Sequence, residues 1–144
     1  KPAREVPAPG PLARATGVTP CVDAKSEFDL LVEVEDEAMV RELTPDLELL
    51  RSIDARGVIV TARGSGAFDF VSRFFGPRVG VDEDPVTGSA HAVLGPWWAE
   101  RLGRTTLVGY QASARGGVVR VETRGERVRL AGQAVTTMRG ELMA

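Results

Sequence analysis

The sequence of 144 residues predicts an α+β fold, and two observations carry this prediction. Between Gly88 and Leu102 the apolar residues recur with helical spacing, and Gly103 follows where a helix is expected to stop. On both sides of this helix stand short apolar segments rich in β-branched residues and separated by glycine-containing turns, a pattern typical of strands. With 43% hydrophobic residues the chain can bury ~70% of its unfolded surface, so we expect one domain with a real core.

The first twenty residues are rich in proline, glycine and alanine, which indicates a connector more than a structural element. Within it, Leu12 to Val18 is predicted to be a short helical turn that ends at a glycine. We therefore divide the chain into a linker, residues 1–20, and a domain, residues 21–144.

The elements of the first part of the domain follow from local patterns. A helix is expected from Glu37, and a second one is expected to open with Thr44 as its cap and Pro45 as its first residue. Strands are predicted at residues 28–34, 57–62 and 68–75. The acidic residues scattered around these helices are interpreted as a solvated face and not as a metal site.

The central helix, residues 88–102, has small residues throughout its first two turns, as a helix enclosed by a curved sheet would need. Pro96 removes one backbone donor, so we expect a bend or a loosened turn there. After it, four short strands are predicted as an antiparallel meander with one solvated face, at residues 107–111, 118–122, 127–130 and 134–138.

The run from Asp84 to His91 carries the chemistry. Thr87 and Ser89 are predicted to cap the helix, and Gly88 allows a ligand to approach the backbone without a Cβ in the way. The free amides at the helix start attract a carboxylate or an oxyanion, and Asp84 would stand beside them as an acceptor or proton carrier. The same pattern is also ordinary helix capping, and spacing alone does not decide between the two.

Three segments together resemble the phenazine biosynthesis-like (PhzF-like) family: residues 73–77, residues 79–91 with Asp-Pro-Val-Thr-Gly-Ser, and residues 111–117. The resemblance runs from about Leu12 to Leu142 and corresponds to the C-terminal half of a usual member. It implies one half of a diaminopimelate-epimerase-like fold, with a curved, mostly antiparallel sheet around a central helix. The linker would then lead out of a missing N-terminal half.

The resemblance also implies roles for individual residues. Asp84 is expected to be catalytic, and Thr87, Gly88 and Ser89 are expected to bind the substrate. The principal acid/base, a glutamate, and a Gly-His-Ala-Thr-type motif belong to the first half in the family, and neither motif occurs here. We expect no cofactor and no metal.

For some other residues the sequence allows two interpretations. His91 is either a packed, hydrogen-bonded helix residue or a general base, and Arg73 either orients an anionic substrate or donates to carbonyls of neighbouring loops. Of the adjacent Trp97 and Trp98, one is predicted to be core and the other to be available to a partner. The single cysteine, Cys21, has no metal-spaced partner and is interpreted as inert.

The charge and hydropathy of the chain limit the classes of partner that we expect. The formal charge is −2 with both signs mixed, which gives no footprint for nucleic acid or an anionic membrane. No apolar run approaches the ~20 residues of a membrane span, and the start of the sequence has no signal-peptide core. We therefore expect a cytoplasmic protein.

Three functions stay open at this point. The first is an isomerase or epimerase half that moves protons on carbon of a small carboxylate-bearing metabolite and is inactive without its N-terminal half. The second is a non-catalytic module that pairs with a second copy of the chain, as a dimer, or with another protein. The third is a protein with the fold and no chemistry.

Overall fold

Strands that follow one another along the chain are neighbours in the sheet. The computed structural model describes residues 2–143, and in them one eight-stranded sheet has the order β1-β2-β3-β4-β5-β6-β7-β8. The strands are β1 (Arg4–Glu5), β2 (Val22–Lys25), β3 (Asp29–Glu33), β4 (Gly57–Arg63), β5 (Phe70–Phe75), β6 (Thr106–Gln111), β7 (Gly117–Arg124) and β8 (Arg127–Ala131). The helices are α1 (Leu12–Thr16), α2 (Glu37–Glu42), α3 (Leu47–Ser52), the 3₁₀ turn η1 (Pro77–Val79) and α4 (Gly88–Leu102).

Most neighbouring strands pair antiparallel, and the two parallel pairs are β3 with β4 and β5 with β6. A parallel pair needs a crossover connection, and each crossover here contains helix: α2 and α3 in the first, α4 in the second. The predicted α+β class with a mostly antiparallel sheet is confirmed.

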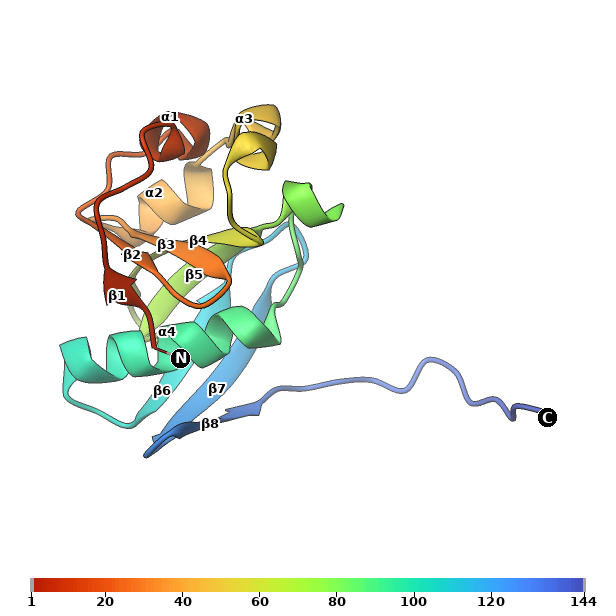
Figure 1. Cartoon of the computed structure of the whole chain (residues 1–144). Coiled ribbons are helices and arrows are strands. Elements are labelled where there is room, and N and C mark those ends of the chain that lie inside the picture. The colour runs from red at the N-terminus through yellow and green to blue at the C-terminus, as the bar shows by residue number, and fades with distance from the viewer. Residues whose placement is uncertain (1, 144) are drawn as a thin grey trace.

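The sheet separates two hydrophobic cores, because successive side chains of a strand point to opposite faces. On β4, Val58 and Val60 belong to the core under α1, α2 and α3, whereas Ile59 belongs to the core against α4. Figure 1 shows α1, α2 and α3 over one face and α4 on the other.

The sheet curves around α4. Near its C-terminal end Arg101 pairs with Glu33 of β3 at 2.7 Å and with Glu5 of β1 at 3.4 Å. The other face of the helix packs on β6, β7 and β8. A Cβ at Gly95 would lie 2.5 Å from Cγ1 of Val121, so this glycine permits the close approach of helix and sheet. The predicted central helix, its start at residue 88 and its stop at Gly103 are confirmed, and it continues through Pro96.

The N-terminal segment contributes more than a connection. Residues 4–5 form β1, which pairs with β2, and α1 buries Leu12 and Ala15 in the core. The predicted helical turn is confirmed, and it ends at Gly17 with φ of 72°. The division of the chain at residue 20 stays a prediction.

Two local predictions were wrong. The second short helix starts at Leu47 and is capped by Asp46, whose Oδ1 accepts from the Leu49 amide at 2.9 Å, so Thr44 is not the cap. Both tryptophans are buried, so neither is available to a partner as predicted. The indole of Trp97 donates to Glu33 at 2.8 Å, and that of Trp98 donates to Thr61 at 3.0 Å. The curved sheet reaches two sides of the helix, which sequence spacing cannot show.

The predicted strand at residues 134–138 was also wrong for the chain as the structure describes it. Residues 132–143 lie in no helix or strand. Figure 1 shows this segment running away from the end of β8, and β propensity alone gives no strand where no other strand lies alongside.

No helix between residues 2 and 143 combines the length and the apolar character that a membrane crossing requires.

Candidate active site

The loop between β5 and α4 carries the predicted site residues. After η1 the chain folds back on β5: Gly76 and Val81 form an isolated antiparallel bridge, and the Asp84 amide donates to the Phe74 carbonyl at 3.1 Å. Thr87 then adopts an extended conformation at the cap position of α4. The loop therefore places Asp84 directly before the start of the helix.

A buried hydrogen-bond network holds Asp84. The Thr87 hydroxyl donates to Asp84 Oδ2 at 2.5 Å. The side-chain amide of Gln111 donates to the Asp84 carbonyl at 2.6 Å and to Thr87 Oγ1 at 3.1 Å, and its Oε1 accepts from the Thr87 amide at 2.8 Å. Gln111 lies at the end of β6 and is fully buried. Thr87 thus holds the carboxylate of Asp84, and Gln111 holds its backbone. Asp84 Oδ1 accepts no hydrogen bond from residues 2–143.

The start of α4 is uncapped in the described part of the chain. The prediction that Thr87 caps the helix was wrong, because its hydroxyl is used by Asp84. No hydrogen bond within residues 2–143 uses the amides of Gly88, Ser89 or Ala90. Gly88 and Ser89 are exposed, so the positive end of a fifteen-residue helix faces the surface beside Asp84.

An arginine from another part of the chain, Arg56, also reaches this surface. Arg56 Nη2 donates to Ser89 Oγ at 3.0 Å, and its Nε donates to Asp29 Oδ1 at 2.9 Å. Asp29 is buried at the start of β3 and anchors the guanidinium, which also lies 5.3 Å from the ring centre of Phe28. Because Ser89 Oγ accepts from Arg56, its own hydrogen is free to donate outward.

His91 lies one turn inside α4 and is fully buried. Its Nδ1 is 2.8 Å from the Thr87 carbonyl, and since a carbonyl only accepts, Nδ1 carries the hydrogen. Burial lowers the pKa of His91, and the bond to Thr87 opposes that shift. Its Nε2 has no partner in the described residues. His91 is therefore the packed, hydrogen-bonded helix residue of the first interpretation. Its ring is not exposed to a substrate in the structure of residues 2–143.

Arg73 is committed to structural contacts. Its guanidinium forms a two-point ion pair with Glu83, at 2.7 and 3.0 Å, and donates to the Leu43 carbonyl at 2.8 Å. The structure therefore favours the second interpretation of Arg73, in which it braces the loop that carries Asp84.

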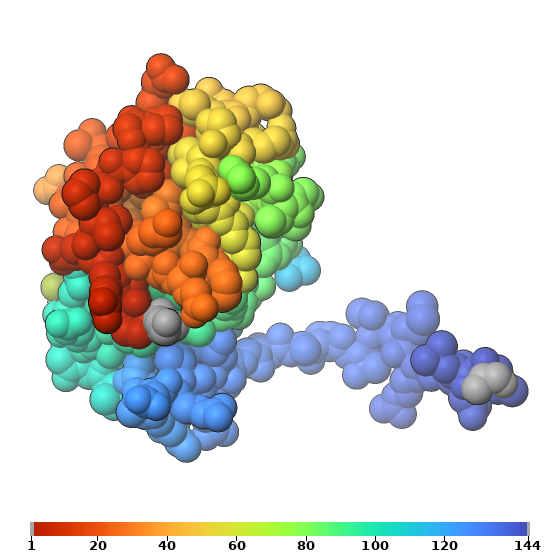
Figure 2. All heavy atoms as spheres, viewed as in Figure 1, coloured from red at the N-terminus to blue at the C-terminus, as the bar shows by residue number. Residues whose placement is uncertain are grey.

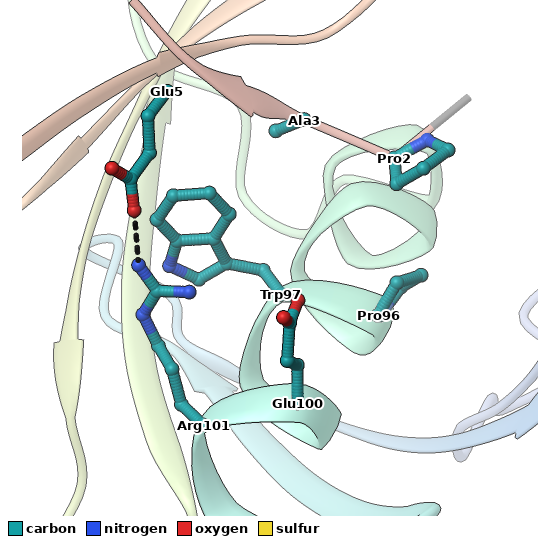
Figure 3. Close-up of a pocket in the computed structure, with 7 residues that line it drawn as sticks. All are labelled: Pro2, Ala3, Glu5, Pro96, Trp97, Glu100 and Arg101. Atoms are coloured by element: carbon teal, nitrogen blue, oxygen red, sulfur yellow. Dashed lines mark hydrogen bonds and ion pairs between the residues drawn. The ribbon is translucent and has the colours of Figure 1, made fainter.

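A shallow pocket of about 160 Å³ lies near the other end of α4 (Figure 3). There the Arg101 guanidinium stacks over the Trp97 ring at 3.6 Å and pairs with Glu5, as Figure 3 shows. Trp97 is nine residues from Gly88, which is ~13 Å along a helix axis. This pocket is thus separate from the loop of Asp84.

Sequence reasoning missed Gln111 and Arg56. Gln111 offered a weak signal, a polar residue at the end of an apolar strand before a glycine-containing turn. Arg56 offered none, because it lies 33 positions before Ser89. Within residues 2–143 no group of three or more His, Cys, Asp or Glu side chains has metal-binding proximity.

The chain is similar in sequence to known proteins over most of its length. The family model for phenazine biosynthesis-like proteins matches residues 8–140. The chain belongs to the phenazine biosynthesis-like protein family. It is 45% identical to an uncharacterized isomerase of Halalkalibacterium halodurans over 144 residues, which are 99% of this chain and 54% of that protein. It is 39% identical to a phenazine biosynthesis-like domain-containing protein of Homo sapiens, over 79% of this chain and 43% of that protein.

Solved structures of the family confirm the fold. A putative phenazine biosynthesis PhzC/PhzF protein from Clostridium difficile superposes with a TM-score of 0.88 at 36% identity, covering 100% of this chain and 55% of that one. A PhzF family protein from Enterococcus faecalis gives a TM-score of 0.84 at 39% identity, covering 94% and 55%. The chain therefore spans about half the length of the relatives it matches.

Proposed function

We propose that this chain is the substrate-holding half of an isomerase that moves a proton on carbon of a small carboxylate-bearing metabolite. The observation that carries the proposal is the combination of open amides at the start of α4 with a carboxylate, Asp84, in the loop directly before them, whose Oδ1 accepts no hydrogen bond within residues 2–143. The Halalkalibacterium halodurans relative is named an uncharacterized isomerase, which supports the reaction class.

Two parts of the site have distinct tasks in this proposal. The amides of Gly88 and Ser89 and the Ser89 hydroxyl accept the negative charge of a carboxylate or of an enolate that forms during proton removal. Asp84 uses Oδ1 to take or give a proton, while Thr87 holds Oδ2 and fixes the direction of the carboxylate.

The second acid/base comes from a companion half. Asp84 is the one site residue of this chain that we assign to proton transfer, because His91 is buried and Arg73 is bound to Glu83. A reaction that removes a proton at one position and returns one at another is served by two groups on different sides of the substrate. The exposed site surface around Ser89 is where the companion half would lie. The proposal holds whether that half belongs to the same polypeptide or to a separate one.

The test joins the first half of the Halalkalibacterium halodurans relative to Lys1 of this chain as one polypeptide. A panel of unsaturated and α-substituted small carboxylates is incubated in D₂O, and deuterium incorporation is followed by NMR. The joined protein should incorporate deuterium, and the 144-residue chain alone should not. Activity of the chain alone at enzyme-like rates would refute the division of roles.

Asp84→Asn in the joined protein should lower the exchange rate about 100- to 10,000-fold, the usual contribution of a positioned acid or base. Asp82→Asn is the matched control, because Asp82 lies in the same loop with 63% of its side chain exposed. Equal rates for Asp84→Asn and the parent would remove Asp84 from the reaction.

A self-associating module is the second candidate, and exposed apolar side chains favour it. Phe28 and Val79 are each 57% exposed, and Phe28 lies beneath the Arg56 guanidinium that contacts Ser89. Light scattering of the chain alone tests it: a stable dimer with no activity in the joined protein would replace the isomerase proposal.

A further inference from the structure

The buried carboxylate of Asp29 binds one arginine. Asp29 lies at the start of β3 with 1% of its side chain exposed, and among residues 2–143 its two carboxylate oxygens accept from Arg56 alone. Nε of Arg56 donates to Oδ1 at 2.9 Å, and Nη2 donates to Oδ2 at 2.5 Å. The desolvation cost of a buried ion pair can exceed its attraction, and apolar side chains in its place are often as stabilising. Stability alone therefore does not explain why a charged pair occupies this position.

The backbone holds both residues of this pair in place. β3 and β4 run parallel with Asp29 opposite Gly57, so the two strands begin at the same edge of the sheet. The Arg56 amide donates to the Phe28 carbonyl at 2.9 Å. The Asp29 amide donates to Ser26 Oγ at 3.0 Å. Figure 2 shows the segment before β3, in orange, beside the segment before β4, in yellow. The guanidinium is thus positioned by the fold before any ligand binds.

The guanidinium of Arg56 lies between Asp29 and Ser89. Its Nη2 donates to Asp29 Oδ2 and, at 3.0 Å, to Ser89 Oγ. Because Ser89 Oγ accepts in this bond, the hydroxyl hydrogen is left to donate elsewhere. A hydroxyl that accepts from a cation is polarised and becomes a stronger donor. The buried pair therefore gives direction to a hydroxyl that would otherwise rotate freely.

Ser89 carries two donors at the start of α4. Its amide is used by no hydrogen bond within residues 2–143, and the residue is exposed. Amide and hydroxyl can together bind one anionic group, and Arg56 acts on the hydroxyl of this pair. A neutral amide group gains less at such donors, because hydrogen bonds to an ionised acceptor are about twice as strong.

We propose that Arg56 is a positioning residue: held by Asp29, it directs the Ser89 hydroxyl at the anionic group of the substrate, so that the site selects a carboxylate over the corresponding neutral amide. The inference rests on the anion site of the proposed function, but not on proton transfer by Asp84. The charges of Arg56 and Asp29 are opposite and adjacent, so their effect on a ligand is local and passes through Ser89.

Binding of benzoate to the 144-residue chain tests the proposal, with the NMR shift of the Gly88 amide as the readout. Benzamide has the same shape and no charge, and it is the matched ligand. Arg56→Gln should weaken benzoate binding about 10-fold, near the lower limit for a hydrogen bond to a charged group, and benzamide binding by less than about twofold. Arg104→Gln is the control variant, because Arg104 pairs with the mostly buried Asp69 beyond the other end of α4. It should bind benzoate like the parent.

A double-mutant cycle separates a positioning role from a merely structural one. Ser89→Ala should weaken benzoate binding about 10-fold as well. Arg56→Gln added to Ser89→Ala should have no further effect, because the hydroxyl through which Arg56 acts is then absent. A loss caused by disturbed packing would persist in the Ser89→Ala background.

A second variant guards against a folding defect, since Arg56→Gln leaves the buried Asp29 carboxylate without its partner. Asp29→Asn/Arg56→Gln removes both charges and should show the same loss of benzoate binding. Equal benzoate binding by this variant and the parent would overturn the inference. So would losses for Arg56→Gln and Ser89→Ala that multiply in the double variant, or a parent chain whose Gly88 amide does not respond to benzoate.

Deuterium incorporation by the joined protein keeps this inference separate from the proposed function. Arg56→Gln in the joined protein should raise KM for the exchanged carboxylate about 10-fold and change kcat less. Weaker benzoate binding by the Arg56 variants, with no deuterium incorporation by the joined protein, would refute the isomerase proposal alone. An active joined protein whose KM is the same with and without Arg56 would refute the positioning role alone.

Discussion

Replacement of Gly95 by alanine tests how closely α4 packs on the sheet. A Cβ at this position would lie 2.5 Å from Cγ1 of Val121 on β7 and 3.2 Å from Cγ1 of Val128 on β8. Both neighbours are valines, whose side chains have little rotational freedom, so the helix or the strands must move. The contact distances therefore predict a loss of stability, although alanine is the better helix former.

The magnitude follows from two opposing effects. Alanine in a helix interior gains about 1 kcal/mol over glycine, and an added methyl group in a packed core costs about 1–3 kcal/mol. The clash involves two stiff side chains at once, so we expect a net loss of about 1–2 kcal/mol. In a domain of this size that corresponds to a melting temperature lower by about 2–8 °C.

Urea denaturation of Gly95→Ala gives the change in the free energy of unfolding. Gly88→Ala on the same helix is the matched control, because its nearest neighbour would be Leu130 Cδ1 at 3.9 Å, an ordinary contact. The double variant Gly95→Ala/Val121→Ala should be more stable than the sum of the two single changes by about 1 kcal/mol, since truncating Val121 makes room. If Gly95→Ala were as stable as Gly88→Ala, the close packing of α4 would be disproved.

Two further predictions concern titration and a buried ion pair. Burial lowers the pKa of His91 below its ordinary value of 6.5, so the unfolded chain takes up the proton first as pH falls. The stability that neutral His91 contributes is thus complete above pH 6.5 and is lost below it, with a slope of up to about 1.4 kcal/mol per pH unit. Urea denaturation between pH 7.5 and 5.5 should show this slope, and His91→Gln should lack it; equal slopes would contradict the assignment. Arg56→Ala leaves the carboxylate of Asp29, which is 1% exposed, without its partner, and should cost about 1–3 kcal/mol after allowance for the partly exposed guanidinium. Arg51→Ala, in an exposed pair, should cost less than about 0.5 kcal/mol, and similar losses for the two variants would argue against a structural role for Arg56.

The sequence predicted the elements whose signals are local. The start and stop of α4 are marked by residues within one turn of its ends, Gly88 and Gly103, and the meander of β6, β7 and β8 is punctuated by glycine turns. Residues 73–77, 79–91 and 111–117 together indicated the family because their residue order is specific. These features depend on neighbours in the chain, and so a single sequence is enough to find them.

Features that depend on distant contacts were not predictable. Whether the Thr87 hydroxyl caps the helix or holds Asp84 is decided by Gln111, which arrives from another strand. Arg56 reaches Ser89 only because β3 and β4 lie side by side and carry Asp29 to the start of the helix.

By itself, then, the sequence determined the class of the fold, its central helix and the place of the candidate site, because backbone geometry and hydrophobic periodicity act over a few residues. The tertiary structure decided how the site is held. It directed Thr87 to Asp84, left the first amides of α4 open, and committed Arg73 to Glu83. It also showed that the strand propensity of residues 134–138 is not satisfied within the described chain, because a strand is stable only beside another.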